Sequence, residues 1–181
     1  EAVSNGGSGS GQLTIGSSAS TLSAATGITL SQADNDFAGT LHASVTSAGA
    51  SITLTDRNAL TLGKVTASSG QLSATAGGIL GLSDTVTVTS LDLHSTGAAG
   101  AITQSSGTLS VSTGSIDLQA VGNITLTQAN DFGSGTLTVV NASDVTLLDA
   151  NALTLSDLMA SVTLTASAGS DLTLAGDIDV D

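Results

Sequence analysis

The chain has 181 residues, of which 40% are hydrophobic but only 1% are aromatic, and it contains no Pro, Cys, Trp or Tyr. Lys and Arg together number two against 15 Asp and Glu, for a net charge of −13, so nucleic-acid binding is excluded because no basic patch can form. No apolar run reaches the roughly 18 residues of a membrane-spanning helix, and membrane insertion is therefore not expected.

Short runs in which aliphatic residues alternate with Thr recur along the whole chain. A period of two is typical of a β-strand, so the aliphatic side chains are predicted to point inward and the Thr outward. The segments between the runs are rich in Gly, Ser, Ala, Asn and Asp, which favour turns. Glu, a helix former, occurs once, so almost no α-helix is expected. The clearest runs are residues 28–30, 52–55, 86–89, 124–127, 162–165 and 172–174.

A longer repeat is superimposed on these runs. The stretch that begins at Gln12 lines up with the one that begins at Thr108, at an offset of about 96 residues. A duplication built of shorter strand units is typical of a solenoid, whose coils bury one another's faces. We therefore predict an all-β parallel β-helix (β-solenoid) of about nine coils of roughly 20 residues each. Residues 1–181 are predicted to be a single solenoid segment of a longer chain, with the repeat over 12–107 and, incompletely, over 108–181.

Each copy of the repeat contains an Asp followed by a Phe. Asp36 precedes Phe37, and Asp131 precedes Phe132. We predict that the two Asp side chains shape turns by hydrogen-bonding the backbone. The Phe rings are predicted to fill the core beneath those turns, the alternative being an exposed aromatic that binds a sugar.

An Asn precedes Ala-Leu-Thr-Leu in both copies, as Asn58 and Asn151. This pattern predicts a turn position with a left-handed backbone conformation, which Asn tolerates. If neighbouring coils carried such residues in register, they would form a short Asn ladder.

Catalysis on glycans would require clustered carboxylates with a base, often beside a cation that stabilises charge. Arg57 and Lys64 are the only Lys and Arg residues. Asp56 is next to Arg57, but the second copy has Ala150 at the Arg57 position, and adjacent residues of a strand point to opposite faces. We expect no catalytic residues and no enzyme activity.

The possible metal ligands are scattered. His42 and His94 have no Cys nearby and no second His at i+2 or i+4, so they are predicted to be plain surface or turn histidines. Calcium is the metal whose oxygen ligands are best represented, but their spacing fits neither an EF-hand loop nor a calcium-binding nonapeptide. We therefore expect no metal and no cofactor, and turn or solvated-strand roles for these acids. The candidate calcium ligands are Asp34, Asn35, Asp36, Asp131, Asp177, Asp179 and Asp181.

The segments GNITLTQANDF, DANALTLS, GAITQSSGTLSV and GSIDLQAVGNITL resemble the repeat regions of filamentous-haemagglutinin-like bacterial adhesins. The likeness covers essentially the whole chain. It implies a right-handed β-helix, export by two-partner secretion through an outer-membrane transporter, and an extracellular adhesive or biofilm role. The secretion domain of such proteins carries Asn-Pro motifs, and this chain has no Pro, so the resemblance is to the shaft.

These observations predict a structural shaft or adhesive segment of a large secreted surface or filament protein, located outside the cell. The expected partners are further coils of the parent chain or neighbouring protomers, with host or matrix glycans as additional candidates. The alternative function is a carbohydrate-active β-helix enzyme, either a polysaccharide lyase or a hydrolase.

Overall fold

In the computed structural model, which describes residues 3–4 and 11–181, the regular structure consists of strands, with no helix. The described part therefore has no helix long and apolar enough to cross a membrane. The strands are β1 Val3–Ser4, β2 Thr14–Ile15, β3 Ser20–Ala24, β4 Ile28–Leu30, β5 Asp36–Phe37, β6 Thr40–Val45, β7 Ile52–Asp56, β8 Leu60–Ala76, β9 Leu80–Leu82, β10 Val86–Ser95, β11 Ile102–Gln104, β12 Leu109–Val111, β13 Ile116–Ala120, β14 Ile124–Asn130, β15 Leu137–Asp149, β16 Leu153–Ala168, β17 Leu172–Leu174 and β18 Ile178–Val180.

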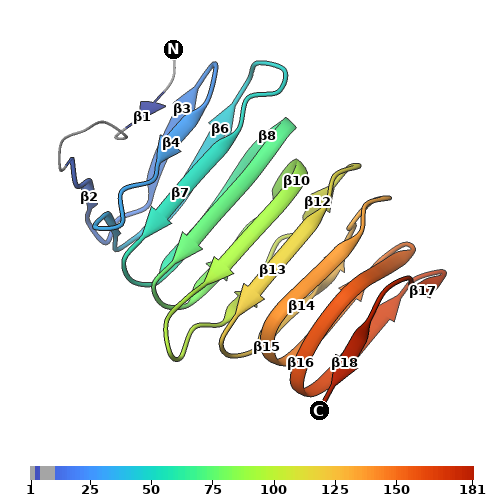
Figure 1. Cartoon of the computed structure of the whole chain (residues 1–181). Helices are drawn as coiled ribbons and strands as arrows, with labels where there is room; N and C mark the ends of the chain where they lie inside the picture. Colours follow the sequence, from blue (N-terminus) through green and yellow to red (C-terminus); the bar gives the residue numbers. More distant parts are fainter. Residues whose placement is uncertain (1–2, 5–10) are drawn as a thin grey trace.

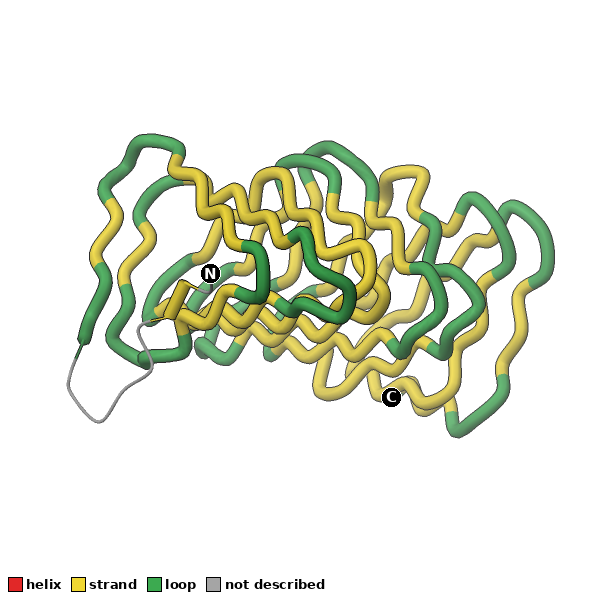
Figure 2. Tube along the Cα trace, turned by 90° about the horizontal axis from the view of Figure 1, so that it is seen from above, coloured by secondary structure: helices red, strands yellow, loops and turns green. Residues whose placement is uncertain are grey.

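The strands stack as a parallel β-solenoid, as predicted. The coils follow one another in sequence order from the N-terminal to the C-terminal end (Figure 1), and strands and loops alternate around each coil (Figure 2). There are about eight turns of roughly 21 residues, close to the predicted nine of roughly 20. Sixteen strands join one continuous sheet, and β2 and β5 form a second.

Aliphatic side chains form in-register columns inside the coils. Ile28 pairs with Ile52, Ile52 with Leu72, Leu72 with Leu91, and Leu91 with Ile116. All five are at most 1% exposed. The alternate residues, such as the Thr residues of β7, are half-buried on the outer face. The inward and outward assignment made from the alternation is thus confirmed, and the burial of these columns is the main favourable term in folding.

Long strands pass around the corners of the solenoid. The beginning of β8 pairs with β9, and its end pairs with β7 and β10. The coils approach each other closely at these corners: a Cβ atom on Gly70 would lie 1.8 Å from the carbonyl oxygen of Ala50 in the preceding coil. Glycine is required there because any side chain would push the two coils apart.

Candidate functional site

Two buried asparagines occupy equivalent places in the two copies of the repeat. Asn35 Oδ1 accepts a hydrogen bond from the backbone N–H of Leu13 at 3.0 Å, and its amide donates to the carbonyl oxygen of Leu30 at 3.1 Å. Asn130 Oδ1 accepts a hydrogen bond from the backbone N–H of Leu109 at 2.9 Å, and its amide donates to the carbonyl oxygen of Leu126 at 3.3 Å. Both side chains are fully buried. They tie neighbouring coils together inside the core, so Asn35 is not available as a calcium ligand.

Two buried carboxylates close the turns beside these asparagines. Asp56 accepts hydrogen bonds from the backbone N–H of Phe37 at 3.0 Å and of Asn58 at 2.9 Å. Asp149 likewise accepts hydrogen bonds from the backbone N–H of Phe132 at 3.2 Å and of Asn151 at 2.8 Å. Burial raises the pKa of both carboxyl groups above the ordinary value, and the backbone hydrogen bonds counteract that effect only in part. Each carboxylate uses both of its oxygens to hold the backbone, which is a structural role.

The two Phe rings fill the core as predicted. Phe37 is 1% exposed and Phe132 is 2% exposed, so neither offers a stacking surface to a sugar. Asp131 shapes its turn as predicted, because its Oδ1 accepts from the backbone N–H of Gly133 at 3.0 Å.

The backbone hydrogen bond predicted for Asp36 is wrong: unlike its counterpart Asp131, its carboxylate bonds to side chains and not to the local backbone. Its partners are the guanidinium group of Arg57 and the amide of Asn58 on the following coil. The Arg57 side chain is 48% exposed, whereas Asp56 is buried. These two neighbours do point to opposite faces, and the Arg57 ion pair is of the surface kind, which contributes little to stability.

The left-handed backbone predicted at Asn58 and Asn151 is wrong. Among the described residues, Asn141 is the one non-glycine residue with a positive φ, 55°. At the two predicted positions, a carboxylate two residues earlier accepts the Asn N–H and closes the turn without a left-handed residue. No Asn ladder forms either, since Gly78 lies next to Asn58 in the following coil and Ser170 next to Asn151.

His42 lies on the outer face of β6, beside a surface hollow of about 510 Å³. Its Nδ1 accepts a hydrogen bond from the backbone N–H of Lys64 at 2.9 Å. A Cβ atom on Gly63 would lie 2.4 Å from the imidazole ring, so this glycine leaves room for the histidine. The rest of the lining consists of Lys64, Ser44, three Thr residues, Ala43 and Val45. Lys64 brings a positive charge to this part of an acidic chain.

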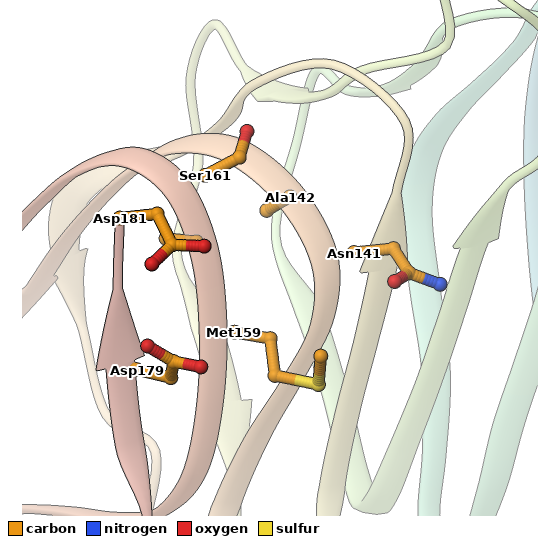
Figure 3. Close-up of a pocket in the computed structure, with 7 residues that line it drawn as sticks. Asn141, Ala142, Met159, Ser161, Asp179 and Asp181 are labelled. Atoms are coloured by element: carbon orange, nitrogen blue, oxygen red, sulfur yellow. The ribbon is translucent and has the colours of Figure 1, made fainter.

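A smaller hollow of about 110 Å³ lies beside the middle of β15 and of β16 and the end of β18 (Figure 3). Asn141 and Met159 line it together with Asp179 and Asp181. These two acids and Asp177 are exposed, which agrees with the predicted solvated strand face.

Three possible metal ligands meet on the outer face of β10 and β13. Asp92 and His94 belong to β10, and Asp117 of β13 pairs in register with Asp92. His94 Nε2 lies 2.8 Å from Asp92 Oδ1. One donor atom from each of the three residues lies within 4.8 Å of the other two. Among the residues that the structure describes, this is the one group of three or more His, Cys, Asp or Glu side chains placed closely enough to share an ion.

This group was not predicted from the sequence, because the spacing of His to His or Cys does not reveal a site in which two of the three ligands are carboxylates. The signal was present in part: His94 follows Asp92 at i+2, on the same face of a strand. The pattern Leu-Asp-Leu at residues 91–93 also returns as Ile-Asp-Leu at 116–118. What local pattern does not supply is the register that sets the two acids side by side.

The comparisons with known proteins concern the repeat itself. The chain matches the model of a family described as repeats of unknown function (DUF5649), over residues 1–44, 49–98 and 80–140. The chain belongs to this family. Each match to the DUF5649 model spans about two to three turns of roughly 21 residues, so the family unit is a group of coils. Neither the curated proteins nor the solved structures give a significant match.

Proposed function

We propose that this DUF5649 chain is a structural shaft or adhesive segment of a large secreted bacterial surface or filament protein, acting in cell adhesion or in a biofilm matrix. The observation that carries the proposal is the parallel pairing of strands from coil to coil along the chain. Each coil contacts mainly its neighbours, so such a rod can be lengthened by adding coils without rearranging those already present. The recurrence of the family match along the chain supports the same modular construction.

The interior favours a mechanical role. A second in-register column runs through Leu60, Leu80, Ile102, Ile124 and Val145, all at 0% exposure. Full burial of one such aliphatic side chain contributes about 1.5–3 kcal/mol. The stabilising contacts are therefore repeated in each coil from Leu60 to Val145, as a shaft that must resist local opening requires.

The outer face favours contact with water over a dedicated catalytic site. The residues that alternate with the first interior column include Thr53, Ser73, Asp92, Asp117 and Thr138, all short and polar. A lyase or hydrolase, the alternative function, needs accessible carboxylates that face one groove. The two acids with a raised pKa, Asp56 and Asp149, are instead buried and bonded to backbone N–H groups.

The test uses cells that produce the parent protein and exploits the register of the coils. Ile52, Leu72 and Leu91 occupy one column, so deletion of residues 52–90 puts Leu91 in the place of Ile52 and removes two whole coils. Deletion of residues 52–85 is the matched control: it brings forward Val86, which belongs to another column and breaks the register. Surface display is followed with an antibody on intact cells, and attachment and biofilm mass are measured in parallel.

For a shaft, the in-register deletion keeps both surface display and attachment, whereas the out-of-register deletion loses both. For an adhesive segment, the in-register deletion keeps display but loses attachment. The proposal fails if the antibody never labels intact wild-type cells, or if the purified chain cleaves polysaccharides.

A further inference from the structure

The outer face of β10 and β13 carries a group of side chains that the shaft function leaves unexplained. Asp92 and Asp117 are paired in register on adjacent coils, and His94 lies on the same face two residues beyond Asp92. In the same outward column, the preceding coil carries Ser73 and the following coil carries Thr138, both neutral. Two acids directly opposite each other on neighbouring strands destabilise a sheet unless a cation lies between them.

The hydrogen bonding of these acids is incomplete. Asp92 Oδ1 and Asp117 Oδ1 are both excluded from solvent; no hydrogen bond reaches Asp117 Oδ1, and Asp92 Oδ1 has only the contact with the His94 imidazole. Among the described residues, these are the two buried side-chain oxygens or nitrogens that accept no hydrogen bond from a hydroxyl, an amide or the backbone, and they belong to one register pair. Buried polar atoms are almost always satisfied in folded proteins, so the unbonded Asp117 Oδ1 indicates a missing partner beside Asp92 and His94.

The nearest group of opposite character is the imidazole of His94, whose Nε2 lies 2.8 Å from Asp92 Oδ1. A protonated His94 carries one positive charge and would leave one carboxylate uncompensated. A divalent cation compensates both carboxylates and leaves the neutral imidazole to act as a nitrogen ligand.

We propose that Asp92, His94 and Asp117 bind one divalent transition-metal ion, and that zinc fits the site best. One donor atom from each residue lies within 4.8 Å of the others, which three ligands of a common ion require. The set of one imidazole and two carboxylates suits zinc, whereas calcium prefers six to eight oxygens. Ser73 supports the site from the preceding coil, because its hydroxyl donates to Asp92 Oδ2 at 3.1 Å and orients that carboxylate.

The ion would join two consecutive coils from outside. Asp92 and His94 come from β10 and Asp117 from β13, which begins after the intervening loop and strands β11 and β12. Because the site needs both coils in register, the metal binds the folded chain in preference to the unfolded one and so stabilises it. The proposed ion stabilises the stacking of two coils within one rod, and this role does not depend on whether the rod serves in adhesion.

The experiment is a titration of the purified chain with zinc chloride, followed by calorimetry and by the ¹⁵N chemical shifts of the two imidazoles. His94→Gln and Asp117→Asn remove one ligand each. The matched controls are His42→Gln, which removes the other imidazole, and Asp171→Asn, which neutralises an exposed acid with no side-chain hydrogen bond in the structure. Circular dichroism verifies that each variant is folded.

The expected result is one zinc ion per chain, with a dissociation constant that rises at least about 10- to 100-fold in His94→Gln and Asp117→Asn, since loss of an outer partner alone has that effect. The controls keep the wild-type constant. In the unmodified chain the His94 nitrogens shift on titration and those of His42 do not, a readout that needs no variant. The proposal is overturned by absence of saturable binding, by binding that His94→Gln leaves unchanged, or by zinc-dependent shifts at His42 instead of His94.

Discussion

Replacement of Asp149 with alanine removes the acceptor of two backbone hydrogen bonds that close one buried turn. Its Oδ2 accepts from the N–H of Phe132 at 3.2 Å, and its Oδ1 accepts from the N–H of Asn151 at 2.8 Å. Phe132 is buried, so its N–H would have no water to bond with, which costs about 1–3 kcal/mol. Asn151 is exposed, so its N–H can turn to water and the loss there is about 0.5–1.5 kcal/mol.

Removal of the carboxylate also relieves the desolvation that raises the pKa of Asp149, and this gain offsets part of the loss. We therefore expect Asp149→Ala to lower the free energy of unfolding by about 2–3 kcal/mol, a substantial share of the roughly 5–15 kcal/mol of a typical domain. Asp171→Ala is the matched control, because Asp171 is exposed and its removal changes the net charge by the same amount.

The assay is urea unfolding followed by circular dichroism, combined with hydrogen exchange of individual amides. Exchange is needed because a solenoid can open locally without unfolding as a whole. The amide of Phe132 is expected to lose protection in Asp149→Ala and to keep it in Asp171→Ala. Agreement of the two variants within about 0.5 kcal/mol, the usual range of neutral surface changes, would mean that the Asp149 carboxylate does not stabilise the turn.

Three further outcomes are expected. Phe132→Ala should lower the free energy of unfolding by about 3–5 kcal/mol in urea titrations; a loss below about 1 kcal/mol would mean that the ring is not a core element. Gly70→Ala should destabilise the fold by about 1–3 kcal/mol, since the new Cβ would lie 1.8 Å from a backbone oxygen. Gly81→Ala should leave the stability unchanged, because the atoms nearest to its Cβ lie at 3.8 Å. Equal melting temperatures for the two variants would contradict this expectation. The raised pKa values of Asp56 and Asp149 mean that the folded chain binds more protons than the unfolded one above pH 3.8, so their contribution to stability declines as the pH rises through the folded pKa. Between pH 3.8 and 7, the melting temperature should fall less with rising pH in the Asp56→Asn/Asp149→Asn double variant than in the unmodified chain. The same slope in both would mean that these two carboxyl groups do not cause the decline.

Much of the fold could be predicted from local pattern alone. The alternation in Ile52-Thr53-Leu54 determines which side chains are buried, because successive residues of a strand face opposite ways. The Phe of each repeat was predicted to be buried, since it is the largest apolar side chain in a chain without Trp or Tyr. These predictions needed only the period of two and the cost of exposing apolar surface.

The turn at Asn58 shows where local pattern misleads. An Asn before a strand is compatible with a left-handed backbone, and nothing in the neighbouring residues rules this out. The deciding contact is the carboxylate of Asp56, which bonds at once to Asn58 and to Phe37 on the preceding coil. The bond to Phe37 depends on how the two coils stack, and this cannot be predicted from the residues around Asn58.

Side-chain size, polarity and a period of two are enough to predict the strands, their buried faces and the absence of helix. Which residues face each other across coils follows instead from the way the coils stack. Coil lengths vary, with register partners 19 residues apart from Leu72 to Leu91 and 25 apart from Asp92 to Asp117. An error of one residue in that spacing turns every side chain of a strand to the other face. The closeness of Asp92, His94 and Asp117 is therefore a property of the stacked coils, set by the loops between them.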